Sequence, residues 1–133
     1  MIATERLSSL ESMLAGDHHR LDRAFERIVT RAQGGDFQQI EAEWSTFQNA
    51  LLDHLDAEER HLLPALAKDR PAEAQALYDD HARIRGQLLQ LGVDLDLHCL
   101  PADRVEAFVE VLRAHAHREE NIFYPWVDRQ LQR

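Results

Sequence analysis

The chain is poor in cysteine, glycine, proline and aromatic residues, and it contains no long apolar run. Cys99 is the single cysteine among 133 residues, so an internal disulfide is excluded and the reducing cytoplasm is the expected compartment. Five glycines, four prolines and 7% aromatic residues argue against a β-rich or disordered chain. No stretch approaches the roughly 20 apolar residues that cross a bilayer, so no membrane association is expected. With 44% hydrophobic and 29% charged residues, the composition is typical of a helical protein.

Basic residues are also scarce. Lysine and arginine number 15 against 24 aspartates and glutamates, and the formal net charge of −9 repels phosphate backbones. Because no basic stripe with interleaved aromatic residues is present, nucleic acid is not an expected partner. Glu5 and Arg6 precede any apolar run, so a secretory signal is not expected either. We expect one domain over residues 1–133.

Apolar residues recur at helical spacing in four segments that turn signals separate. The expected helices cover residues 7–33, 36–67 and 71–90, and a fourth begins at Pro101 after a loop from Gly92. Asp36 is the expected N-cap of the second helix. Pro64 and Pro125 should each kink or end the helix that contains them. Four amphipathic helices with short connections predict an all-α fold, an antiparallel up-down-up-down four-helix bundle.

A histidine–glutamate motif occurs twice in the chain. His54 and Glu58 recur 61 residues later as His115 and Glu119. Residues four apart on a helix are neighbours, about 6 Å between Cβ atoms, so both side chains of a pair can reach one metal ion. Upstream of each pair, the dipeptides at 17–18 and 80–81 are both Asp-His, at an offset of 63. The chain is therefore interpreted as a helical hairpin made twice.

The spacing of four histidines places them at one height in such a bundle. In a helical hairpin, two residues equidistant from the turn lie at the same level, because each residue rises about 1.5 Å. The midpoint of His18 and His54 is residue 36, beside the first expected turn. The midpoint of His54 and His81 lies between residues 67 and 68, and that of His81 and His115 is residue 98. Both fall at expected turns, so the four histidines are predicted to share one layer.

This layer suggests a metal site built from four imidazoles and two carboxylates. The candidate ligands are His18, His54, Glu58, His81, His115 and Glu119. Mixed nitrogen and oxygen ligands suit iron, with zinc or manganese as alternatives, and two glutamates suit a pair of ions better than one. The competing interpretation is that each histidine packs separately with a backbone partner. Buried carboxylates without a metal would, however, be costly to desolvate.

The ordered set His, His-x3-Glu, His, His-x3-Glu, with a Glu-Glu-x4-Pro tail in each repeat, resembles the hemerythrin-like family of bacterial HHE cation-binding proteins. The resemblance covers residues 10 to 131. It implies a hemerythrin-like fold and a non-haem diiron centre. By resemblance, Glu58 and Glu119 would bridge the two irons, and His18, His54, His81 and His115 would be the terminal ligands.

One position departs from the family pattern. The oxygen-carrying hemerythrins have a further histidine four residues after the third-helix ligand, which gives one iron three histidines and the other two. In this chain that position is Arg85. The resemblance therefore argues against plain oxygen transport and favours reaction with oxygen or peroxide, or simple metal holding.

Several residues near the layer are candidates for supporting roles. Asp22 could be an extra carboxylate ligand, but a salt bridge to Arg85 is the preferred interpretation. His61 shares a face with His54 about 10 Å further along the axis and is not a preferred direct ligand. Tyr78 is interpreted as a core aromatic residue, with a phenolate ligand as the alternative. The off-phase or loop histidines are not first-choice ligands: His19, His98 and His117.

Two pairs of residues repeat beside the ligands. Phe47 and Phe108 correspond across the repeat and are expected to seal the layer from water. Glu59 and Glu120 follow the ligand glutamates directly; they could accept hydrogen bonds from ligand N–H groups or be solvated charges.

The leading functional hypothesis is a non-haem diiron protein that binds or reduces a small oxidant such as oxygen, peroxide or nitric oxide. The alternative is a non-catalytic module for iron holding, delivery or sensing, because the same ligands serve both functions. A metal-free helical interaction protein is disfavoured by the aligned histidines. The sequence leaves the oligomeric state open.

Overall fold

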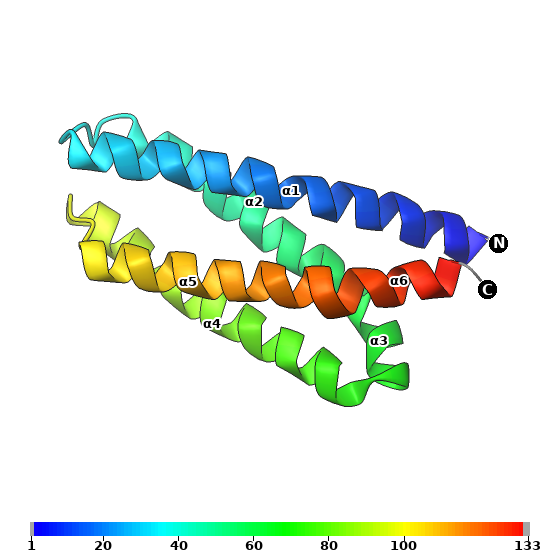
Figure 1. Ribbon diagram of the computed structural model, residues 1–133. Helices are drawn as coiled ribbons and strands as arrows, with labels where there is room; N and C mark the ends of the chain where they lie inside the picture. Colours follow the sequence, from blue (N-terminus) through cyan, green and yellow to red (C-terminus); the bar gives the residue numbers. More distant parts are fainter. Residues whose placement is uncertain (1, 132–133) are drawn as a thin grey trace.

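The computed structural model describes residues 2–131, with side chains from Asp17 to Gln130, and within this part of the chain all the regular secondary structure is helical (Figure 1). The α-helices are α1 (Ile2–Gln33), α2 (Ile40–His61), α3 (Leu63–Asp69), α4 (Pro71–Asp96), α5 (Ala102–Arg118) and α6 (Tyr124–Leu131). A π-helix, η1 (Glu119–Phe123), joins α5 to α6. Among the described residues, no helix is long and apolar enough to cross a membrane.

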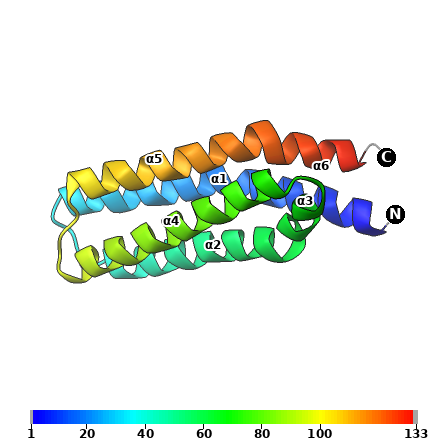
Figure 2. The same cartoon turned by 90° about the horizontal axis from the view of Figure 1, so that it is seen from below.

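The four long helices α1, α2, α4 and α5 lie lengthwise beside one another (Figures 1 and 2). The turns between α1 and α2 and between α4 and α5 are at one end of the molecule, and α3 and both termini are at the other. α1 packs against α2 and α4 against α5, and α6 extends α5 along α1. The two halves of the chain, which carry the two sequence repeats, therefore lie side by side along the length of the molecule.

Four of the predicted helix boundaries were wrong. α1 begins at Ile2 and not at residue 7, and α2 ends at His61 and not at residue 67. α2 begins at Ile40 and not after Asp36, because Asp36 completes the turn that ends α1: its backbone N–H donates to the Arg31 carbonyl over 3.0 Å. α4 continues through Gly92 to Asp96. A Cβ at Gly92 would lie 3.3 Å from Nε1 of Trp44, so this glycine permits close helix packing and does not break the helix.

Both prolines interrupt their helices as predicted, but in different ways. α2 ends at His61, and Pro64 lies in the first turn of α3. In the second repeat the helix axis continues, and the missing N–H of Pro125 is accommodated by the π-helix η1 just before it. A π-turn inside a helix often occurs at a functional site, and this one begins at the predicted ligand Glu119.

The apolar core is divided into two clusters. The larger cluster includes the aromatic side chains Phe25, Phe47 and Phe108, whose ring centroids are 5.2 to 6.4 Å apart. The second cluster gathers residues of α2, α3, α4, η1 and α6, including Leu62 and Phe123. The buried polar residues of the histidine layer belong to neither cluster.

Candidate metal centre

The four predicted histidines converge in the interior, as their spacing indicated. His18 comes from α1, His54 from α2, His81 from α4 and His115 from α5. The ring centroids of His18 and His54 are 5.0 Å apart, and those of His81 and His115 are 4.9 Å apart. His54, His81 and His115 are buried, whereas the side chain of His18 is 20% exposed. The prediction of a common histidine layer is confirmed.

All six candidate ligands fall into two groups of three. His18, His54 and Glu119 form one group, in which one ligand atom from each residue lies within 4.8 Å of the others. Glu58, His81 and His115 form the second group under the same limit. We call the first the outer triad, because His18 is partly exposed, and the second the inner triad, because all three residues are buried.

The two glutamates connect the triads. Glu58 lies 3.0 Å through Oε1 from His81 Nε2, and its Oε2 lies 3.5 Å from His54 Nε2 in the outer triad. Glu119 Oε1 lies 3.1 Å from His18 Nε2 and 2.8 Å from His115 Nε2 in the inner triad. Each carboxylate therefore faces imidazoles of both triads, which is the placement that a bridging ligand needs.

Four of these buried atoms have no hydrogen-bond partner. They are Nε2 of His54, Nε2 of His115, Oε2 of Glu58 and Oε2 of Glu119. Unpaired polar atoms in an interior are costly, and native structures contain few of them. Nε2 of His54 lies 3.5 Å from Oε2 of Glu58, and Nε2 of His115 lies 2.8 Å from the other oxygen of Glu119, in both cases without the alignment of a hydrogen bond. Imidazole nitrogens and carboxylate oxygens arranged in this way fit metal cations.

The charges of the layer are strongly coupled. Burial alone would raise the pKa of Glu58, but contacts with His115, His54 and His81 outweigh it and hold this pKa well below 4.5. Burial, together with the nearby His54, lowers the pKa of His18 below 6.5. Glu58 is thus an anion that imidazoles stabilise, and His18 favours the neutral form that binds metal.

Three of the histidines are held by carboxylates on the side away from the layer. His54 Nδ1 lies 3.1 Å from Asp17, His81 Nδ1 lies 2.6 Å from Glu59, and His115 Nδ1 lies 3.2 Å from Asp80. An Nδ1–H that donates to a carboxylate leaves Nε2 available for a metal ion. Glu59 therefore takes the first of its two predicted roles, whereas Glu120 is exposed. The other two carboxylates, Asp17 and Asp80, belong to the repeated Asp-His dipeptide, which is the sequence signal that could have predicted their role.

The predicted salt bridge between Asp22 and Arg85 was wrong. Arg85 donates to Glu59 over 2.7 Å and to Asp56 over 3.2 Å. Both acceptors are on α2, which packs against α4, whereas Asp22 is exposed on α1. Asp22 belongs to neither triad.

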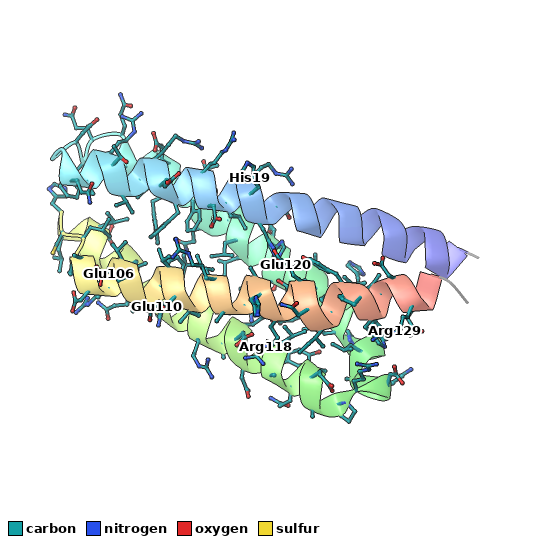
Figure 3. All side chains as sticks on the ribbon, in the orientation of Figure 1. His19, Glu106, Glu110, Arg118, Glu120 and Arg129 are labelled. Carbon is teal, nitrogen blue, oxygen red and sulfur yellow. The ribbon has the colours of Figure 1, made fainter. Side chains whose placement is uncertain are left out.

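The remaining histidines are outside the layer. His19, His61, His98 and His117 are exposed, and His19 points away from the other helices (Figure 3). Tyr78 packs against the second apolar cluster, as its interpretation as a core residue predicted. The tyrosine beside the site is instead Tyr124, whose hydroxyl lies 3.4 Å from His18 Nε2. Sequence reasoning missed Tyr124 because it follows the π-helix, where regular helical phase is lost.

A small cavity of about 70 Å³ adjoins the outer triad. His18, His54 and His115 line it, together with apolar side chains such as Leu21 and Leu112. Asp22 and Arg113, both exposed, also line it. The cavity connects the partly exposed side of the layer to the surface between α1 and α5.

The pH dependence of the metal-free protein follows from His54 and His115. Burial lowers the pKa of each imidazole, but Asp17, Glu58 and Asp80 outweigh burial, and both values are raised above 6.5. Their contribution to stability is therefore complete below pH 6.5 and is lost as pH rises through the raised values. We expect the free energy of unfolding, measured with denaturant in a chelator, to fall as pH rises from 6.5 through the raised pKa values of His54 and His115.

Two other groups of the layer, His18 and Glu58, have lowered pKa values, and both affect stability outside this pH range. The lowered pKa of His18 changes the free energy of unfolding below pH 6.5, and that of Glu58 changes it below pH 4.5. In metal-loaded protein the trend should reverse, because protons compete with metal for imidazole. A free energy of unfolding that rises with pH in the metal-free protein would contradict the coupling described here.

The family comparison agrees with this geometry. The family model described as hemerythrin HHE cation binding domain matches residues 9–127, a span that includes both triads. Neither the curated proteins nor the solved structures contain a significant match to the chain. The matched span covers most of the 133 residues and all six residues of the two triads. The chain therefore belongs to the hemerythrin family, as its histidine and glutamate pattern indicated.

Proposed function

We propose that this chain is an up-down-up-down antiparallel four-helix bundle that holds two iron ions and binds or reduces a small oxidant such as oxygen, peroxide or nitric oxide. The outer and inner triads would each hold one ion, with Glu58 and Glu119 shared between them. When bound, the iron pair supplies the electrons for reduction. The family match to a cation-binding domain supports metal binding in general, and the arrangement of the side chains supports a pair of ions.

The observation that carries the proposal is the set of four unpaired buried atoms. Two belong to histidines and two to glutamates, and they are divided between the triads. A single ion could not use all six side chains and keep a position for an exchangeable ligand. Two ions can use all six, because each triad supplies three donors and each glutamate faces both triads.

The cavity supports a small ligand. Its volume of about 70 Å³ is far below the roughly 300–1,000 Å³ of pockets that bind organic ligands. Leu21, Leu51 and Leu112 give it an apolar lining beside the histidines. Such a space suits oxygen, nitric oxide or peroxide and is too small for an organic substrate.

The contacts of Arg85 favour reaction with an oxidant over reversible transport of oxygen. Its guanidinium is engaged by Glu59 and Asp56, so this position supplies no donor to the inner triad. With three donors in each triad and two shared glutamates, neither ion would be fully enclosed by protein ligands. Ions with open positions react with oxidants more readily than ions with complete ligation.

The proposal is tested with protein loaded anaerobically with ferrous iron. We expect exposure to air to oxidise both ions within minutes to a stable ferric form with near-ultraviolet absorption. The ferric protein should then consume hydrogen peroxide faster than the metal-free protein. Reversible uptake of oxygen that is released under vacuum would contradict this and indicate a carrier. Stable iron binding without peroxide consumption would indicate the holding or sensing module instead.

A further inference from the structure

Three arginines extend the hydrogen bonds of the site histidines to the surface. Arg85 donates to Glu59 over 2.7 Å, and Glu59 lies 2.6 Å from His81 Nδ1. Arg118 donates through Nε to Asp80 over 2.9 Å, and the same oxygen, Oδ2, lies 3.2 Å from His115 Nδ1. Each chain of contacts thus consists of an arginine, a carboxylate and an imidazole.

The third chain repeats the arrangement in the first half of the sequence. Arg20 forms an ion pair with Asp17, and Asp17 lies 3.1 Å from His54 Nδ1. Asp17 and His54 correspond across the repeat to Asp80 and His115, so the contact from α1 to α2 is matched by one from α4 to α5. Figure 3 shows Arg118 on the side of α5 that faces α4.

His18 lacks the corresponding chain within the described residues. Its contacts are made through Nε2, with Glu119 at 3.1 Å and the Tyr124 hydroxyl at 3.4 Å. Glu120, which matches Glu59 across the repeat, is exposed and lies in the π-helix, whereas Glu59 lies in a regular α-helix. Burial and His54 lower the pKa of His18, and the charge of Glu120 acts on His18 against this lowering, but the described residues show no hydrogen bond between Glu120 and His18.

We infer that Arg20, Arg85 and Arg118 are positioning residues, an inference that rests on the proposed function. Two of them, Arg85 and Arg118, act on the inner triad and only Arg20 acts on the outer triad, and this uneven distribution makes the two metal positions unequal. In the inner triad both histidines are fixed, His81 through Glu59 and His115 through Asp80. In the outer triad only His54 is fixed, and His18 is partly exposed. The inner triad therefore binds its ion more tightly, and the outer triad loads last and releases first.

The physical reason is preorganisation. A carboxylate on Nδ1 fixes the ring orientation and tautomer and increases the basicity of Nε2, and its loss usually weakens metal binding about 10- to 100-fold. An arginine that clamps the carboxylate limits its rotation and keeps it charged. Arg85, at the position that departs from the oxygen carriers, thus acts on the inner ion through Glu59 and His81 without touching it.

The test uses the full chain and Co²⁺ in competition with a chromophoric chelator. Wild-type protein should show two affinity classes, and His18→Ala should lose the weaker class while the tighter class is retained, weakened through the shared glutamates. Arg85→Gln should weaken the tighter class by about 3- to 10-fold, and Glu59→Gln by about 10-fold or more. Arg85→Lys, which restores a cationic donor, should recover most of the loss. Arg27→Gln, at an exposed position on α1, is the matched control and should change neither class.

A second readout separates positioning from general stability. In zinc-loaded protein with ¹⁵N-labelled histidine, the Nδ1 proton of His81 should exchange slowly with solvent, and Arg85→Gln should accelerate this exchange. The inference is overturned if wild-type protein binds two ions but Arg85→Gln and Glu59→Gln leave the tighter class unchanged. It is also overturned if His18→Ala removes the tighter class. If the wild-type protein binds no Co²⁺, the proposed metal function fails together with the inference.

Discussion

Replacing His54 by alanine is expected to abolish metal binding at the outer triad and to weaken the inner ion at least about tenfold. His54 Nε2 is one of the unpaired buried atoms, and it lies 3.5 Å from Glu58 and 3.9 Å from Glu119. Without His54 and the outer ion, the two shared glutamates are no longer fixed from the outer side, so they are less preorganised ligands for the inner ion. Iron content per chain and the affinity of the remaining ion measure the effect.

His19→Ala is the matched control for this experiment. His19 is adjacent to a ligand in the sequence but is exposed and points away from the other helices (Figure 3). Its replacement should leave both ions in place. If His54→Ala lost one ion while the other kept its wild-type affinity, the glutamates would not be shared between two ions.

Replacing Phe108 by alanine is expected to destabilise the metal-free protein by about 3–5 kcal/mol. Phe108 is fully buried, and its ring centroid lies 5.2 Å from Phe25 and 6.4 Å from Phe47. The three phenylalanines and Leu88 are each seven residues from a site histidine, so the cavity would open about two turns from the layer. Denaturant unfolding in a chelator measures the loss.

Leu89→Ala provides the comparison for this effect. Leu89 is 73% exposed on α4, so its truncation should change the free energy of unfolding by no more than about 0.5 kcal/mol. Equal losses of unfolding free energy in Phe108→Ala and Leu89→Ala would contradict the expected contribution of the aromatic cluster to stability.

The sequence predicted the histidine layer because its position depends only on helical rise and turn location. An error of a few residues in a helix end does not move the midpoint of a pair such as His81 and His115. α4 could therefore extend well beyond the predicted boundary without disturbing the site. The exact ends depended on tertiary contacts, such as the packing of Trp44 against Gly92, that periodicity does not contain.

The contacts outside the layer were harder to predict. Arg85 was assigned to Asp22 by matching positions in the repeat, but the two halves are not exact copies. Helical phase indicates which face a side chain occupies, not which of two neighbouring helices its long side chain reaches. Asp17 and Asp80 were visible as a repeated dipeptide, yet their role depends on the crossing of neighbouring helices, which only the structure provides.

The number of ions per chain tests the central claim most directly. Metal-free protein is loaded anaerobically with excess ferrous iron, freed of unbound metal, and measured for iron and protein content. The two triads and their shared glutamates predict two iron ions per chain, falling to one in His54→Ala. At most one iron per wild-type chain would contradict the paired site.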